Sequence, residues 1–242
     1  MKDIHAVKGR YYISRLVEEG EHERQDFKFL VSDARKIARS VSAFANNAGG
    51  HLLVGVKDNG VIAGIRNEED IYMIETAAES FCSPPAKVAF TAYKVEPGVV
   101  VVKADIPPAA ARPVFVREAD NRLKAYFRVN DENIAAHPLM LRAWSYEADD
   151  RSSPLVLSEI HNRLVSLISA EGFLSFDNVW RQLHISVDYA SEMVARMVAS
   201  RILRLTYIHG NLVIPLADPS YPTLANIYIS QPFPTLLPTN VG

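Results

Sequence analysis

The stretch from Phe44 to Gly60, FANNAGGHLLVGVKDNG, constrains the fold of this chain more than any other segment. Before it, Ser32 predicts the N-cap of a helix whose apolar residues recur at helical spacing. The Gly-Gly pair predicts the end of that helix, and residues 51–56 read as a buried strand. The Asn-Gly pair that follows predicts a tight turn and a returning strand over residues 61–65. The apolar positions of the helix are Ile37, Val41, Phe44 and Ala45.

The rest of the first 147 residues mixes strands and helices. A second helix is expected from about residue 68 to residue 81, because Pro84 and Pro85 follow it. A further helix is expected at residues 138–146. Helices that cover one face of a mostly antiparallel sheet predict an α+β domain over residues 1–147. The expected strands are residues 87–95, 99–106, 113–117 and 123–129.

A second domain is expected beyond a short polar hinge at residues 148–153. Residues 154–216 predict three helices and then a β-hairpin, which is the plan of a winged helix. Residues 217–242 are rich in proline and apolar side chains and predict an extended arm. Because such an arm needs a surface to cover it, we expect a homodimer. The expected helices are residues 154–169, a short helix capped by Ser175, and residues 187–200, and the hairpin strands are residues 203–207 and 212–214.

Composition limits how this chain can bind a partner. It has 26 basic and 28 acidic residues, a formal net charge of −2, so nucleic-acid binding requires a local basic patch. The one cysteine, Cys82, excludes an internal disulfide framework, favours a cytoplasmic location and is expected to be a small buried residue. No stretch approaches the roughly 18 apolar residues that cross a bilayer, so no membrane association is expected.

Two kinds of enzyme site are not encoded in the sequence. The Asn-Asn-Ala-Gly-Gly run of residues 46–50 lacks the Gly-Lys-Ser/Thr end of a P-loop, which excludes nucleotide hydrolysis of that type. The histidines show no HExxH spacing and no Gly-x-Ser-x-Gly elbow occurs, which excludes two common hydrolase mechanisms.

Three segments in order resemble the Schlafen AlbA-type (AlbA_2, DNA-binding) family. The first is Glu21–Lys28, EHERQDFK, which is similar to an acid, four spacers and an acid-Phe-Lys segment. The second is the Phe44–Gly60 run, which resembles AFAN-x-x-GG followed by L-x-(I/V)-G-V-x-D-x-G. The third is Tyr126–Asn130, YFRVN, which resembles the late Y-x-R-x-G strand, with Asn130 in place of glycine. The resemblance implies an AlbA-like α+β fold and a role in handling nucleic acid.

In the nuclease branch of that family, three carboxylates gather to hold a divalent metal and cleave RNA. By motif matching, the resemblance implies that Glu21, Asp26 and Asp58 would be the metal ligands and catalytic residues, with Mg²⁺ or Mn²⁺ as cofactor. Asp26 stands where glutamate is more usual, and its shorter side chain would loosen such a site. The alternative interpretation is that all three are solvated acids, with Asp58 favoured by the turn itself.

Nucleic-acid binding without cleavage requires cations and aromatic rings on one surface. Lys124, Tyr126 and Arg128 alternate along one expected strand and so share a face. Each of the cations, taken singly, is equally compatible with a solvated surface charge. The predicted patch also takes in Lys28, the helix residues Arg35, Lys36 and Arg39, and, as further candidates, Arg112, Arg117 and Arg122.

The second domain gives a more ambiguous electrostatic pattern. Arg196 and Arg201 are candidate nucleic-acid contacts in and after its third helix. Asp188 and Glu192 near the start of that helix oppose phosphate binding, and residues 150–216 carry six basic and six acidic residues. DNA reading and a protein-contact or dimerisation role both remain open for this domain.

Taken together, these patterns favour a cytoplasmic transcription regulator. It would bind DNA or RNA through the AlbA-like domain, with the winged helix aiding DNA binding or dimerisation, and would need no cofactor for binding. The alternative function is a divalent-metal-dependent endoribonuclease that uses the three carboxylates. A third hypothesis, a protein-interaction scaffold without a nucleic-acid role, also fits the composition.

Overall fold

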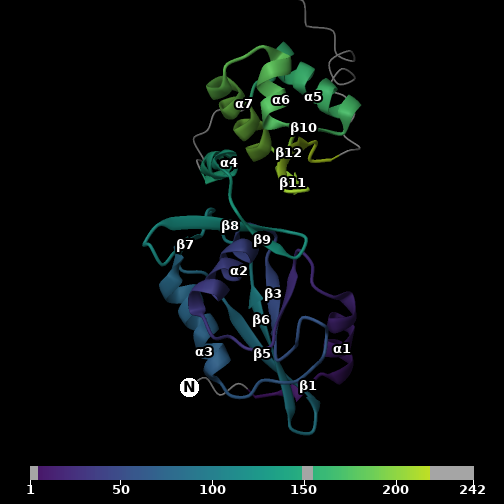
Figure 1. Cartoon of the computed structure of the whole chain (residues 1–242), viewed down its shortest axis with the longest axis vertical. Coiled ribbons are helices and arrows are strands. Elements are labelled where there is room, and N and C mark those ends of the chain that lie inside the picture. The colour runs from purple at the N-terminus through teal and green to yellow at the C-terminus, as the bar shows by residue number, and fades with distance from the viewer. Residues whose placement is uncertain (1–4, 149–154, 219–242) are drawn as a thin grey trace, which may run out of the picture. The chain divides into compact units, whose positions relative to one another are not determined.

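The computed structural model describes residues 5–148 and 155–218 of the chain. The chain divides into two compact units, residues 1–150 and residues 151–242 (Figure 1). Most of the expected hinge at residues 148–153 and of the expected arm at residues 217–242 lies outside the described residues. Within the described part of the chain, no helix is long and apolar enough to cross a membrane.

The first unit is built on a five-stranded mixed sheet in the order β1-β5-β6-β3-β2. The pairs β1/β5 and β2/β3 are parallel, whereas β5/β6 and β3/β6 are antiparallel. The strands before and after the first predicted helix, β2 and β3, are therefore neighbours in the sheet. The strands are β1 (Val7–Lys8), β2 (Gln25–Lys28), β3 (Gly50–Val54), β5 (Ala89–Glu96) and β6 (Val99–Ile106).

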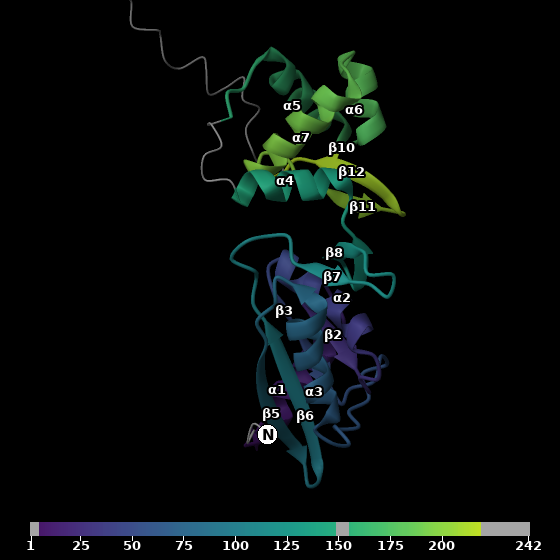
Figure 2. The same ribbon diagram turned by 90° about the vertical axis from the view of Figure 1, so that its left-hand side faces the viewer.

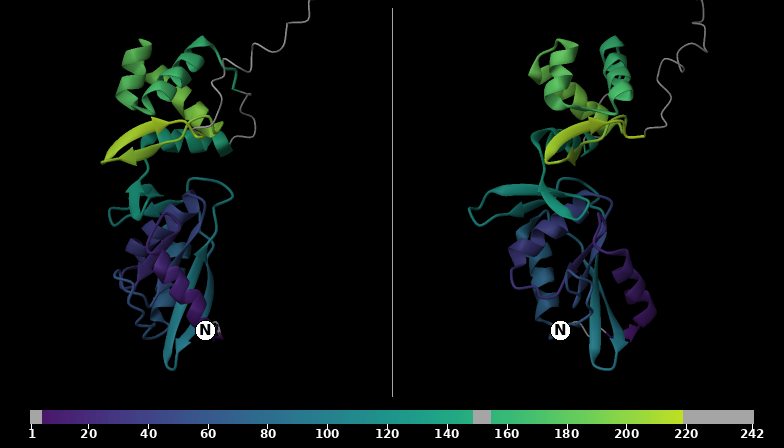
Figure 3. Two further views of the ribbon diagram at one scale, coloured as in Figure 1. Left: turned by 90° about the vertical axis from the view of Figure 1, so that its right-hand side faces the viewer. Right: turned by 45° about the vertical axis from the view of Figure 1, so that its right-hand side comes forward.

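Helices cover both faces of this sheet. One face packs on α1 (Arg10–Glu19), whose Ile13 is fully buried. The other face packs on α2 (Ala34–Asn46) and on α3 (Glu69–Thr76), which continues as the π-helical turn η1 (Ala77–Phe81). Figure 3 shows α1 on the opposite side of the sheet from α2 and α3. Strand β3 contributes side chains to the hydrophobic cores on both faces of the sheet. Leu52 and Val54 pack on the α2 side, and Leu53 packs on the α1 side.

A second sheet, in the order β4-β7-β8-β9, packs against α2. Tyr126 of β8 belongs to the same core as Phe44 of α2, although some 80 residues separate them. A helix, α4, follows this sheet. These elements are β4 (Cys82–Ser83), β7 (Phe115–Arg117), β8 (Leu123–Val129), β9 (Glu132–Ala135) and α4 (Pro138–Ala148).

The predicted α+β class is correct, and several elements match their expected bounds. Strands β6 and β8 occupy the predicted residues, and Cys82 is a buried free thiol whose pKa burial raises to about 12. The N-cap of α2 is Asp33 and not Ser32, because the Asp33 carboxylate accepts the N–H groups of Arg35 and Lys36.

The returning strand predicted at residues 61–65 is wrong. One isolated bridge, Val56 to Ile62, replaces the hairpin, and the N–H groups of Ala63 and Gly64 both donate to the carbonyl of Gly55. Gly55 has φ +96°, and a Cβ there would lie 2.6 Å from the backbone of Gly64. The chain therefore folds tightly back on Gly55 instead of extending as a strand.

The second unit contains three helices and a three-stranded antiparallel sheet in the order β10-β12-β11. Ser175 caps its second helix, as expected, by accepting the N–H of Asn178. The core includes the fully buried Leu164, Ile168 and Met197. The predicted helices and hairpin are present, and assignment to the winged-helix fold stays a prediction. The elements are α5 (Glu159–Glu171), β10 (Phe173–Ser175), α6 (Phe176–Leu183), α7 (Val187–Ala199), β11 (Thr206–Ile208) and β12 (Asn211–Pro215).

Candidate nucleic-acid interface

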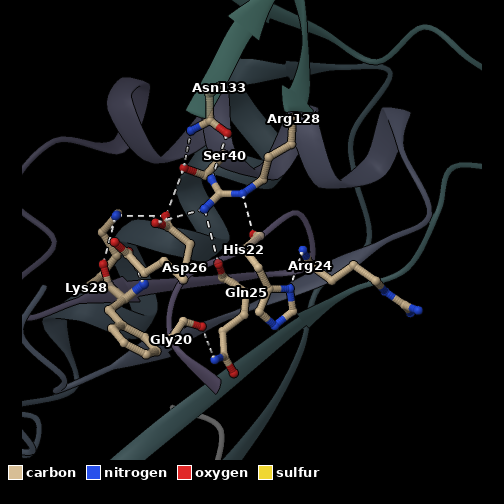
Figure 4. Close-up of polar contacts among 11 residues, drawn as sticks. Gly20, His22, Arg24, Gln25, Asp26, Lys28, Ser40, Arg128 and Asn133 are labelled. Carbon is tan, nitrogen blue, oxygen red and sulfur yellow. Dashed lines mark hydrogen bonds and ion pairs between the residues drawn. The ribbon is translucent and has the colours of Figure 1, made fainter. Parts of the chain in front are cut away.

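Arg128, predicted to face phosphate, lies inside the first unit (Figure 4). Its side chain has no exposed surface, and its guanidinium lies 5.0 Å from the ring centre of Phe44. The Nε atom donates to the carbonyl of His22 at 3.0 Å, and Nη2 donates to the carbonyl of Gln25 at 3.1 Å. Because its hydrogen-bonding capacity is used within the fold, Arg128 fastens β8 to β2 and does not contact a polyanion.

Asp26 of β2 is the charged partner of Arg128. Its Oδ1 accepts from Arg128 Nη2 at 3.3 Å, and its Oδ2 lies 2.7 Å from Lys28 Nζ. Burial raises the pKa of Asp26, but the Lys28 charge and the hydrogen bonds it receives outweigh burial and lower that pKa below its usual value. Ser40 and Asn133 complete what we call the Arg128 network: Arg128, Asp26, Lys28, Ser40 and Asn133.

Glu21 meets Asp26 at the edge of this network. Its Oε1 accepts the N–H of Phe27 at 2.8 Å. Burial and the hydrogen bond with Asp26 raise the pKa of Glu21, whereas the Phe27 N–H and the Lys28 charge oppose the rise. Two carboxyl groups in contact favour one shared proton, so this pair behaves as a unit when it titrates.

The three predicted carboxylates differ in their surroundings. Asp58 lies exposed in the turn after β3, whereas Asp26 is buried and held by two cations. Among residues 5–148 and 155–218, no three His, Cys, Asp or Glu side chains come together to hold a metal ion. The assignment of Glu21, Asp26 and Asp58 as ligands of Mg²⁺ or Mn²⁺ therefore stays a prediction.

A second ionic group lies where β8 meets α2. Glu118 receives two hydrogen bonds from Arg39, at 3.0 and 2.7 Å, and one from the Tyr126 hydroxyl. These bonds hold the pKa of Glu118 below its usual value, with the Arg39 bond as the largest cause. Tyr126 is buried, and burial raises its pKa to about 12. The predicted stacking role of Tyr126 is therefore wrong for the folded domain, because its ring packs in the core.

The predicted cations that remain exposed lie on α2 and β8. Arg35 and Lys36 are exposed on the first turn of α2, with Arg35 over the ring of Phe81 at 5.1 Å. Lys124 is exposed on β8, and its charge contributes to the lowered pKa of Glu118. The half-exposed Arg39 side chain links the two elements through Glu118. We call these four residues, Arg35, Lys36, Arg39 and Lys124, the α2–β8 surface.

The other predicted cations also divide into residues that are paired within the fold and residues that are exposed. Lys28 is half-buried and paired with Asp26, and Arg112 donates to the Asn46 carbonyl at 2.8 Å and lies over the Trp144 ring. Arg117 and Arg122 are exposed near β8. In the second unit, Arg201 is exposed and Arg196 is partly buried.

Sequence reasoning missed the role of Asn46 in the Ala-Asn-Asn run. Its Nδ2 donates to the carbonyls of Val114 and Tyr126, at 3.0 and 2.8 Å, and its Oδ1 accepts the N–H of Val114 at 2.7 Å. Asn46 therefore pins the end of α2 to the second sheet. Gly49 follows with φ +75°, and a Cβ there would lie 2.9 Å from the Ile106 carbonyl oxygen. The segment from Asn46 to Gly49 therefore connects α2 to both sheets. The signal in the sequence was a polar residue at a helix end, where buried backbone groups need hydrogen-bond partners.

Residues 21–137 match the family described as Schlafen, AlbA_2. This match supports a Schlafen AlbA_2-type domain within the first unit, and with it nucleic-acid binding as the general role of that domain. The match covers the Arg128 network and the α2–β8 surface, and it leaves residues 138–242 unassigned.

The crystal structure of the DIP2311 protein from Corynebacterium diphtheriae is similar to this chain at 18% sequence identity, with a TM-score of 0.40. The likeness covers 81% of this chain and 40% of that one, so this chain spans less than half the length of DIP2311. No protein of curated function matches the chain.

Proposed function

We propose that this chain is a nucleic-acid-binding transcription regulator, and that its α2–β8 surface contacts the phosphate backbone. The observation that carries the proposal is the position of Arg35, Lys36 and Lys124, which are exposed within an AlbA_2-type domain. Glu118, the buried acid beside this surface, has both carboxylate oxygens bound by Arg39, whereas the side chains of Arg35, Lys36 and Lys124 are exposed to solvent. Exposed lysine and arginine on adjoining elements suit backbone contacts, which position a protein without reading sequence.

The second unit has a supporting role in this proposal. Its α7 carries Asp188 in the first turn, where a carboxylate would repel phosphate at the groove-facing end of a winged helix. Arg201 and Arg204 are exposed beyond the end of α7. The unit would therefore orient DNA through these residues or join two copies of the chain in a homodimer. Light scattering of the whole chain, with and without duplex DNA, measures which of the two roles applies.

Salt-dependent binding tests the proposal directly. Fluorescence anisotropy would follow binding of labelled duplex DNA and of tRNA over a series of salt concentrations. The variant Arg35→Ala/Lys36→Ala/Lys124→Ala should reduce the slope of log affinity against log salt by about two to three, since each lost phosphate contact removes about 0.9 for duplex DNA. A matched variant, Lys8→Ala/Arg15→Ala/Lys94→Ala, removes three exposed cations from α1, β1 and β5 and should leave the slope unchanged. A slope near zero for the wild type, or equal losses in both variants, would contradict the proposal.

The metal-dependent endoribonuclease is the alternative function, and the same samples test it. The Glu21–Asp26 carboxyl pair is the feature that favours it, and the pairing of both Asp26 oxygens with Lys28 and Arg128 opposes it. Incubation of tRNA with Mn²⁺ should leave the RNA intact if the protein only binds it. Metal-dependent cleavage that disappears in Glu21→Ala/Asp58→Ala would replace the proposed function with the nuclease.

A further inference from the structure

A cavity of about 680 Å³ lies between the start of α3 and the strands β5 and β6. Figure 2 shows α3 running beside these two strands. The cavity is distinct from the Arg128 network and from the α2–β8 surface, because none of those residues lines it. Its volume falls within the range of about 300–1,000 Å³ that is common for small-molecule sites.

The floor of the cavity is apolar and made of small side chains. Ala92 of β5 lies opposite Val102 of β6, and Val100, two residues before Val102, shares the same face. Gly98 at the β5–β6 turn adds no side chain. Ala92 and Val102 are buried beneath α3, so the accessible part of the floor is formed by Val100 and Ile65.

The walls of the cavity are fixed by buried contacts. The N–H of Ile65 donates to the carbonyl of Val100 at 2.7 Å, which holds the loop before α3 against β6. Asp70, which is 4% exposed, accepts the N–H of Val31 at 2.7 Å and holds the first turn of α3. Ile71 packs from α3 into the core beneath. The cavity is thus preformed, which lowers the entropic cost of binding a ligand.

The mouth of the cavity is acidic. Glu68, Glu69 and Glu75 line it, together with Tyr72, which is 65% exposed. Arg66 also lines it, but its guanidinium lies over the ring of Phe29 at 5.3 Å. The two exposed carboxylates of Glu68 and Glu69 outnumber the single guanidinium of Arg66, so the mouth carries a net negative charge above an apolar floor.

We propose that this cavity binds a small amphipathic organic cation. The apolar or aromatic body of the ligand would lie on Val100 and Ile65, and its ammonium group would face Glu68, Glu69 and the Tyr72 ring. An anionic ligand with the same body would place its charge against the carboxylates and bind less tightly. The proposal does not depend on nucleic-acid binding.

Two ligands with the same ring system and opposite charge test this inference. Tryptamine and indole-3-propionate would each be titrated into the full chain, followed by amide chemical shifts in NMR spectra. Tryptamine should bind with shifts confined to α3, β5 and β6, and at least about tenfold more tightly than indole-3-propionate. Absence of tryptamine binding up to about 10 mM, or equal binding of both compounds, would overturn the proposal.

Variants separate the two parts of the proposed site. Glu68→Gln/Glu69→Gln removes two rim charges and should weaken tryptamine binding about fivefold to tenfold, whereas Glu18→Gln/Glu79→Gln removes two exposed charges elsewhere and should not. Val100→Phe should block both ligands by filling the floor, with its melting temperature measured to show that the domain is folded. Tryptamine binding that is unchanged in the rim variant would overturn the assignment even if Val100→Phe fails to fold.

Discussion

The Arg128 network and the α2–β8 surface both contain basic side chains, but these side chains are buried or half-buried and paired in the network and exposed or half-exposed to solvent on the surface. In the network, Arg128 is enclosed and its donors go to two carbonyls, Asp26 and Asn133. On the surface, Arg35, Lys36 and Lys124 have side chains open to solvent. A buried charge is stabilising only when its partners are complete, whereas an exposed charge contributes little to stability and is available to a ligand.

The difference shows that the charge of a residue does not reveal its role until its surroundings are known. Lys124 and Arg128 lie on the same face of β8, four residues apart, yet the end of β8 that carries Arg128 is covered by β2 and α2. The network should therefore control folding, and the surface should control binding. Unfolding can be followed in a Trp180→Phe background, so that Trp144 alone reports on the first unit.

Removing Arg128 should have the largest effect on stability. Arg128→Ala should lower the free energy of unfolding by about 3–5 kcal/mol, because Asp26 stays buried without its partner and two carbonyls lose their donor. Lys124→Ala on the same strand should change it by less than about 0.5 kcal/mol. Chemical denaturation measures both, and a loss under about 1 kcal/mol for Arg128→Ala would show that the network is not structural.

Acidification should have the next largest effect, through His51 of β3. Burial, aided by the charge of Lys103, lowers the pKa of His51 from 6.5 to about 4, and its Nε2 is paired with Gln25 Oε1 at 2.8 Å. Because the unfolded chain binds the proton more tightly, this group removes about 2–3 kcal/mol of stability as pH falls from 6.5 to 4.

The His51→Gln variant should show a flatter dependence of stability on pH over that window, whereas His209→Gln, at an exposed turn, should follow the wild type. Proton NMR of the His51 ring gives an independent measurement. A titration midpoint near 6.5 in the folded protein would contradict this explanation.

Truncation of Asn46 should have an intermediate effect. Asn46→Ala leaves the Val114 N–H and the carbonyls of Val114 and Tyr126 without this partner, so the free energy of unfolding should fall by about 1–3 kcal/mol. The exposed Asn162→Ala should change it by less than about 0.5 kcal/mol. If both variants unfold at the same denaturant concentration, the end of α2 is not the joint between the two sheets.

The α2–β8 surface should have the smallest effect on stability. Arg35→Ala/Lys36→Ala/Lys124→Ala should change the free energy of unfolding by less than about 1 kcal/mol, because these side chains are exposed. The same variant should lose affinity for duplex DNA at low salt. A variant that is destabilised to the same degree as Arg128→Ala would remove the distinction between the two regions.

Local sequence patterns predicted many elements because their signals lie within a few residues. The Val99–Ile106 and Leu123–Val129 strands, the end of α2 at Asn46 and the Ser175 cap all depend on such short-range chemistry. The patterns missed β1 and β2, which have two and four residues and pair in parallel with distant strands. The returning strand failed because Gly55 and Gly64 permit a tighter path than a hairpin.

The candidate site was predictable only in its residue types. The alternation of Lys124, Tyr126 and Arg128 correctly placed three side chains on one face of a strand, but it could not tell which part of that face is covered. Asp26, Glu118 and Asn46 each bind at least one partner that lies between 14 and 102 residues away in the sequence. No local pattern encodes such pairings.

The sequence by itself determined the α+β class, the end of a helix before Gly49 and Gly50 and the need for a local basic patch, because propensity, glycine geometry and net charge are local or summed properties. Tertiary structure alone decided that Arg128 and Tyr126 are internal and that Arg35, Lys36 and Lys124 are exposed. It also decided that Asp58 is exposed whereas Asp26 is buried. The physical reason is that exposure depends on which distant element packs over a residue, and only the folded chain fixes that.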